Sequence, residues 1–315
     1  MYQALLMVSL LSLGLQESDE AQQYRQDYAQ YEDIMAMTDT VERATAFMDF
    51  VDQGFDDRLI GVVAVGIQTA LEELSGDVLY PLGDRWDAQT GAVTGAVRSL
   101  QSAAGAGDHA NIVKYGEIVY AANPITEIAE ILAGSNSALG NNDKYLEYAN
   151  VVIEDKGVAE SFDFAYNIFQ QERSTENWDA VAGWANRLKA LSAAPPGVSV
   201  ADWRNMGIEF QRSIARAEFE GGRYPNAITQ YRMLADMDRS LRAISNIYMG
   251  RSHFAIGGPD QVNQALARFA DAAVVNDPNV SDAAMRMVEE IYTTNTGTLE
   301  RIDENVLDAA RERMR

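Results

Sequence analysis

Apolar residues recur at steps of three and four positions along most of the chain, which is the spacing of one face of an α-helix. Strand signals are nearly absent, because no Asn-Gly or Asp-Gly turn joins two alternating runs, and the β-branched cluster at 62–65 lies inside a longer helical pattern. The pattern therefore predicts an all-α protein with helices of about 12–20 residues. The two clearest apolar series are Tyr24, Tyr28, Tyr31, Ile34 and Met35, and then Ala44, Phe47, Met48, Val51, Phe55 and Leu59.

Glycine, proline and asparagine interrupt this pattern at a nearly constant interval. Three turn sequences begin 34 residues apart, at Gly107, Asn141 and Thr175, and Gly222 lies 35 residues before Gly257. A period near 34 is the signature of solenoids built from helix hairpins. A single hairpin has an apolar face that it cannot bury alone, so neighbouring hairpins stack to complete the core.

Two of these units share a detailed pattern of small and large residues. A glycine marks the turn, alanine and an aromatic residue occupy fixed positions of the second helix, and the second of the two units ends at a proline. The first unit has Gly222, Tyr224, Ala227, Tyr231 and Leu234, and the second has Met249, Gly250, Gly257, Ala265, Phe269, Ala272 and Pro278. Less complete versions occur at 107–124 and 133–153, and residues 203–210 fit the first helix. Over about residues 100–280 the chain resembles the tetratricopeptide-repeat (TPR) family.

The resemblance implies a right-handed α-α superhelix of stacked hairpins with capping helices at both ends, and it implies no activity. We expect six segments: an apolar leader at 1–16, an N-terminal helical region at 17–100, repeats at 101–194, a linker at 195–200, repeats at 201–297 and a C-terminal capping helix at 298–315. The leader has the length of a secretory signal, although no Lys or Arg precedes it and no A-x-A site follows. We expect export to the periplasm or membrane surface, and a buried first helix in a cytoplasmic protein is the alternative.

Composition excludes several kinds of function. The chain has 25 basic and 47 acidic residues, and this net charge of −22 disfavours nucleic acid as a partner. It has no cysteine, and its two histidines, His109 and His253, are far apart in sequence. No phosphate-binding loop or catalytic motif occurs, and Glu17-Ser18 and Glu160-Ser161 lack the stretch that follows the catalytic glutamate of lytic transglycosylases. We therefore expect no enzymatic activity, no cofactor and no metal.

Charge is unevenly distributed along the chain. Residues 1–100 hold 5 basic and 17 acidic residues, whereas residues 201–251 hold 8 arginines and 6 acidic residues. Arginine binds carboxylates through planar, bidentate hydrogen bonds. By the TPR resemblance, first helices line a concave groove, and the candidate partner-binding residues are Arg212, Arg216, Arg251, Phe219 and Phe254. The alternative is that these arginines pair internally with Glu209, Glu218, Glu220 or the acidic N-terminal region. Trp178, Trp184 and Trp203 are interpreted as packing residues.

These observations favour a protein-binding scaffold or accessory subunit of a bacterial envelope-associated complex. Its partner would be a protein or peptide, such as an acidic segment or a C-terminus, and the partner could belong to a membrane complex. Two alternatives remain open at this point. One is a non-catalytic superhelical or glycan-binding module of a cell-wall enzyme system, and the other is a cytoplasmic TPR adaptor.

Overall fold

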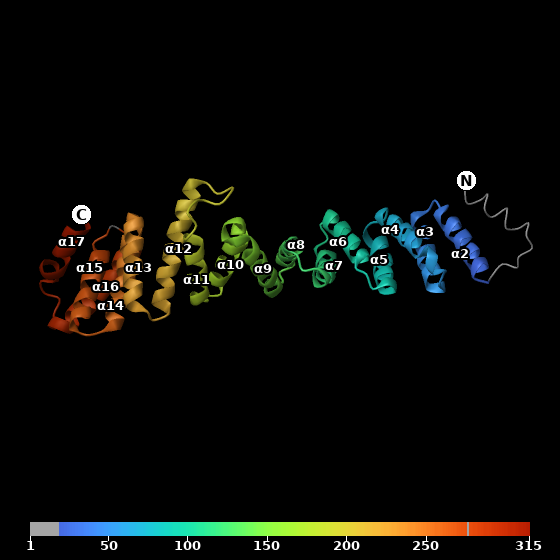
Figure 1. Ribbon diagram of the computed structural model, residues 1–315. Helices are drawn as coiled ribbons and strands as arrows, with labels where there is room; N and C mark the ends of the chain where they lie inside the picture. The colour runs from blue at the N-terminus through green and yellow to red at the C-terminus, as the bar shows by residue number, and fades with distance from the viewer. Residues whose placement is uncertain (1–18, 276) are drawn as a thin grey trace, which may run out of the picture. The chain divides into compact units, whose positions relative to one another are not determined.

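The computed structural model describes residues 19–275 and 277–315, so the predicted leader at 1–16 lies outside the described residues. Throughout that part of the chain every regular element is a helix and no strand occurs, which confirms the all-α prediction. Within each of the two units described below, most helices pack against the next one in the chain (Figure 1). None of the described helices combines the length and the apolar composition needed to cross a membrane.

The chain divides into two compact units, Met1–Val152 and Ile153–Arg315. In the first unit the strongest packing joins neighbours in the sequence, such as α5 with α6 and α6 with α7. Its described elements are α2 (Asp19–Met35), α3 (Thr40–Gln53), the 3-10 turn η1 (Asp57–Leu59), α4 (Ile60–Glu72), α5 (Gly76–Thr90), α6 (Thr94–Ala106), α7 (His109–Ala122), α8 (Thr126–Ala138) and the first part of α9 (Asn142–Glu160).

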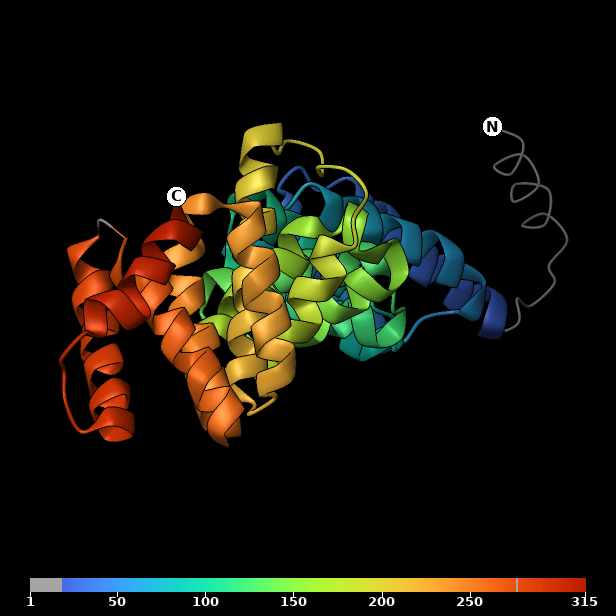
Figure 2. The same ribbon diagram turned by 90° about the vertical axis from the view of Figure 1, so that its left-hand side faces the viewer.

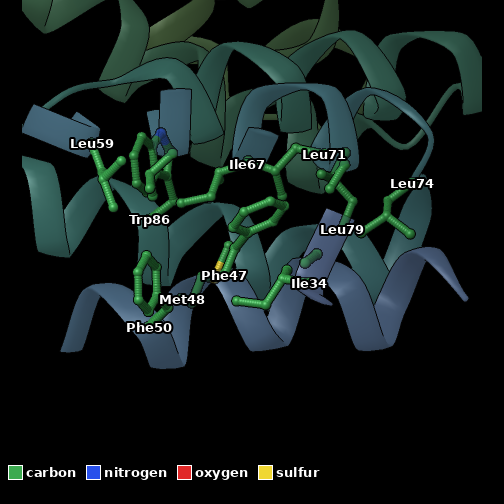
Figure 3. Close-up of a cluster of buried hydrophobic side chains, with 13 residues drawn as sticks. Ile34, Phe47, Met48, Phe50, Leu59, Ile67, Leu71, Leu74, Leu79 and Trp86 are labelled. Atoms are coloured by element: carbon green, nitrogen blue, oxygen red, sulfur yellow. The ribbon is translucent and has the colours of Figure 1, made fainter. Parts of the chain in front are cut away.

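Phe47 lies at the centre of the largest apolar cluster of the first unit (Figure 3). Its ring packs directly over Gly66 of α4, where an added Cβ would lie 3.1 Å or less from three ring carbons. Ile34 of α2 and Leu79 of α5 belong to the same buried cluster. Burial of such large side chains contributes roughly 1.5–3 kcal/mol each, so this cluster holds α2 to α5 together.

Helices α5 and α6 cross at a pair of glycines. A Cβ on Gly95 would lie 2.7 Å from the Cα of Gly83 and closer still to its carbonyl group. The same crossing is fixed by Asp87, whose two carboxylate oxygens each accept a 2.7 Å hydrogen bond, one from the backbone N–H of Gly95 and one from that of Ala96. The carboxylate thereby satisfies two N–H groups of the first turn of α6, which have no partner inside the helix.

The second unit contains the remainder of α9, which is interrupted at Gly157 with φ +81°. Helix α12 is the longest described element of this unit and extends beyond its neighbours at its N-terminal end (Figures 1 and 2). The other elements are α10 (Phe162–Ser174), α11 (Trp178–Lys189), α12 (Val200–Glu220), α13 (Tyr224–Met237), η2 (Arg239–Leu241), α14 (Arg242–Ile256), α15 (Pro259–Ala273), α16 (Pro278–Thr296), the π-helical turn η3 (Asp303–Leu307) and α17 (Asp308–Met314).

Helices begin and end near most of the predicted turns. Gly107 caps α6 in the left-handed conformation, with φ +68°, and 190–199 separates α11 from α12. Residues 201–220 form one continuous helix, which includes the stretch 203–210 that fits the first helix of a repeat. Two helices differ from their expected bounds. The helix expected over 43–59 is broken at Gly54, which has φ +77°, and the helical turns expected from 298 begin only after Arg301.

Buried polar side chains join the helices of the second unit. Gln211 of α12 is fully buried, accepts a hydrogen bond from Lys189 of α11 and donates to the backbone and side-chain oxygens of Gln230 of α13 at 2.9 Å. Further along the chain, buried Asp271 of α15 pairs with Arg313 of α17 at 2.7 Å. Because buried polar groups are costly when they have no partner, these bonds favour one relative position of the helices.

The glycine crossing predicts a pair of opposite effects within one helix. Gly95→Ala forces a methyl group into the backbone of α5, so we expect a loss of about 1–3 kcal/mol in the free energy of unfolding. Gly105→Ala is the matched control, because its added Cβ meets nothing within 4 Å. We expect this second variant to be unchanged or up to about 1 kcal/mol more stable. Urea denaturation followed by circular dichroism measures both, and equal stability of the two variants would contradict the crossing.

The turn before α4 predicts a pH dependence. Asp56 accepts hydrogen bonds from Arg58 Nε and Nη2 at 2.7 and 2.6 Å, and these bonds lower the pKa of Asp56 from 3.8 to about 2. Because the pKa is lower in the folded state, this stabilisation is present above about pH 4 and is lost as the pH falls toward 2. We expect Asp56→Asn to lower the urea midpoint at pH 7 and to make a smaller difference at pH 3. Asp57→Asn, which removes a carboxylate with no hydrogen bond to a described residue, should show no such trend.

Candidate cleft beside helix 12

A cleft of about 720 Å³ lies in the second unit, and residues of α12, α13 and α14 form most of its wall. This volume is within the usual range for ligand sites in proteins. Arg173 near the end of α10 and Trp178 at the start of α11 also line it. Its lining residues are Arg173, Trp178, Asn205, Ile208, Glu209, Arg212, Ser213, Arg216, Tyr231, Leu234, Asp238, Leu241, Ile244 and Tyr248. We refer to it as the α12 cleft.

Two tyrosines stack in the wall of the α12 cleft. The rings of Tyr231 and Tyr248 are nearly parallel, with centroids 4.8 Å apart, and Phe219 meets Tyr248 edge-on at 5.2 Å. Tyr231 is only 2% exposed. Burial raises the pKa of the Tyr231 phenol far above its usual range, with nearby Tyr248 raising it further. Tyr231 therefore stays protonated at physiological pH and contributes an uncharged wall.

Arg216 is held in place on several sides. Its guanidinium donates to the hydroxyl oxygen of Tyr248 and pairs with Glu220 one turn later in α12. The guanidinium carbon also lies 5.1 Å from the ring centroid of Tyr248 and 5.7 Å from that of Trp178. Contacts between a cation and aromatic rings at these distances are favourable. The charge of Arg216 is thus balanced within the protein. This agrees with the alternative given in the sequence analysis, in which the arginine pairs internally with Glu220.

Glu209 balances a second arginine of the α12 cleft. Its carboxylate pairs with Arg173 of α10 and also accepts hydrogen bonds from the Tyr166 hydroxyl at 3.1 Å and the Gln170 amide at 3.2 Å. Burial is the main cause of the raised pKa of Tyr166, and the negative charge of Glu209 raises it further. Three donors therefore occupy Glu209, and Arg173 is not available as a free positive charge.

Arg212 differs from the other two arginines that line the α12 cleft. It is exposed, and it forms no ion pair or hydrogen bond with any residue in the described ranges. It is nevertheless near the tyrosine pair, because its positive charge acts to lower the pKa of Tyr231. Arg212 therefore contributes a guanidinium whose hydrogen-bonding groups are free to bind an anion.

The predicted binding residues occupy different surroundings. Arg212 and Arg216 line the α12 cleft together, whereas Arg251 does not line it and lies with its guanidinium carbon 5.6 Å from the ring centroid of Tyr248. Phe219 packs behind the cleft wall against Tyr248. Phe254 is 51% exposed and is not among the lining residues. The structure thus brings two of the five predicted residues into one site.

Other lining residues were not singled out from the sequence as binding residues. Trp178 lines the α12 cleft, although it was interpreted as a packing residue, while Trp203 does pack, against Phe162 and Phe210. Tyr231 and Tyr248 come from neighbouring hairpins. Their meeting depends on the packing of α13 against α14, for which the sequence carries no direct signal beyond the repeat spacing.

The two histidines and the acidic side chains are the candidates for metal ligands. Among the described residues, no group of three or more His, Cys, Asp or Glu side chains could hold a metal ion. His109 Nδ1 lies 3.4 Å from the Ser135 hydroxyl, and His253 Nδ1 lies 2.7 Å from the Gln261 side chain. Each histidine has a local polar partner in the helical packing, and neither lines the α12 cleft.

No protein-family description, no curated protein and no solved structure matches this chain. The geometry of the α12 cleft is therefore the basis for the function proposed below.

The two neighbouring arginines predict different effects on stability. Arg216→Ala removes the contacts with two rings and leaves Glu220 without its partner, so we expect a loss of about 1–2 kcal/mol in the free energy of unfolding. Arg212→Ala removes an exposed side chain without a partner in the described residues, and its effect should stay within about 0.5 kcal/mol. Thermal and urea denaturation of both variants checks this, and a larger loss for Arg212→Ala would contradict the assigned contacts.

Proposed function

We propose that this protein is a non-catalytic scaffold or accessory subunit of a bacterial envelope-associated complex, and that it binds a segment of a partner protein in the α12 cleft. The observation that carries this proposal is Arg212, an unpaired guanidinium beside apolar and aromatic walls. A site of this kind combines shape with a charge-assisted contact, which is how grooves select peptide segments.

The wider parts of the proposal follow from the sequence. Residues 1–16 direct export, the protein works in the periplasm or at the membrane surface, and the hairpins form a right-handed superhelix closed by capping helices. The described part of the chain supports the helical packing on which this depends. An acidic surface, with a net charge of −22 for the chain, keeps such a scaffold soluble and limits non-specific contact with polyanions.

The aromatic residues of the α12 cleft bear on the glycan-binding alternative. Sugars stack on ring faces that are open to solvent, but Tyr231 and Tyr248 stack on each other. The ring of Trp178 has the guanidinium of Arg216 5.7 Å from its centroid. These contacts favour a peptide partner over a glycan.

Reversing the free charge tests the proposal. We expect Arg212→Glu to lower recovery of the partner at least tenfold when tagged protein is incubated with an envelope extract of the native host, because an attractive contact becomes repulsive. Arg232→Glu is the matched control, since Arg232 is also exposed and unpaired among the described residues but does not line the α12 cleft. Quantitative mass spectrometry compares the recovered proteins, and binding of the purified partner then confirms the difference.

Two results would contradict the proposal. Equal recovery by wild-type protein and by folded Arg212→Glu would show that the α12 cleft is not the binding site. Recovery of cytosolic proteins alone, by a protein whose N-terminus in the host is still Met1, would instead support the cytoplasmic adaptor.

A further inference from the structure

Two of the three arginines that line the α12 cleft have an acidic partner. Arg173 is paired with Glu209, and Arg216 is paired with Glu220. Asp238, the other acidic residue of the lining, accepts a hydrogen bond from the backbone N–H of Ser240. Among the lining arginines, Arg212 is the one that forms no ion pair with a described residue. The lining therefore offers a single arginine, and not a cluster of them, to an acidic group.

A second polar group of the α12 cleft lacks a partner. Ser213 follows Arg212 in α12, lines the cleft and is 5% exposed, yet its hydroxyl forms no hydrogen bond with a described residue. Because its oxygen reaches the surface of the cleft, this hydroxyl can donate a hydrogen bond to a ligand that supplies an acceptor. Arg212 and Ser213 are both donors, so the group that suits them is an acceptor with negative charge.

The remainder of the lining is apolar. Trp178, Leu234, Leu241 and Ile244 line the same cleft as Arg212. Burial of an apolar side chain there is favourable, because its surface is removed from water. A ligand that fits both the donors Arg212 and Ser213 and the apolar lining therefore carries one carboxylate next to one large apolar group.

We infer, on the basis of the proposed function, that the partner segment binds through a single carboxylate held by Arg212 and Ser213 and through one large apolar side chain against the apolar wall. The carboxylate can come from an Asp or Glu side chain or from a peptide C-terminus. An acidic run without an apolar residue does not bind, because only one of the arginines that line the α12 cleft has no acidic partner among the described residues.

Defined peptides test this inference on the full chain. Four fluorescein-labelled eight-residue peptides are compared by anisotropy: one with internal Phe-Asp and an amidated end, one ending in Phe with a free carboxylate, the same peptide amidated, and one with four consecutive aspartates and no apolar residue. We expect one of the first two to bind at least tenfold more tightly than the last two, which corresponds to the loss of one charged hydrogen bond. Which of the first two binds better identifies the source of the carboxylate.

Variants connect this binding to the named residues. Arg212→Gln should reduce the affinity for the best peptide to the value measured for the peptide that ends in amidated Phe and has no carboxylate. Ser213→Ala should reduce the affinity for the best peptide a few-fold. Arg232→Gln should leave that affinity unchanged. Affinity should fall only weakly with added salt, because a single ion pair is involved.

Three results would overturn the inference. They are preferred binding of the four-aspartate peptide, an unchanged affinity in Arg212→Gln, and the absence of binding by either single-carboxylate peptide at about 1 mM, a concentration chosen to detect affinities near −4 kcal/mol. If Arg212→Glu still abolishes capture of the natural partner, only this inference fails. If capture also persists in that variant, the proposed function fails with it.

Discussion

Short helices cannot bury their apolar faces alone, and this constraint governs the whole structure. Most helices here have 12 to 17 residues, and isolated helices of that length are marginal in water. Each one therefore depends on its neighbours in the chain, and close contact requires small residues at the crossings. Phe47 over Gly66 in the first unit and Phe269 over Gly250 in the second are the same solution, a ring packed on a glycine. Glycine at these positions serves packing and not flexibility.

The α12 cleft is a product of the polar bonds that fix these helices. Gln211 joins α12 to α11 and α13, and Glu209 joins α12 to α10. Arg173 is balanced by Glu209 and Arg216 by Glu220, so two of the three arginines that line the α12 cleft have an internal partner. Among these three, Arg212 is the one that lies outside that network. The function proposed for Arg212 thus depends on a guanidinium that has no partner among the described residues.

The sequence predicts the fold much better than the site. Helical periodicity and the glycine turns are local signals, so α2, the capping glycine Gly107 and the continuous helix at 201–220 could be expected from them. The break at Gly54 was missed because the apolar spacing continues across it. The site depends on which charges meet in space. The excess of arginine at 201–251 and the four-residue spacing of Arg216 and Glu220 were visible in the sequence. The contacts of Arg216 with Tyr248 and Trp178, and the pairing of Glu209 with Arg173, are set by packing between helices.

Packing in chain order has a mechanical consequence. Within each unit the main contacts join a helix to the next one, so a pulling force on the chain acts on one interface at a time. Such a unit lengthens in steps of about one helix, and each step can reverse while the remaining helices stay packed. Helices of the second unit that lie far from α12 would then separate and repack while the helices around Arg212 stay in contact.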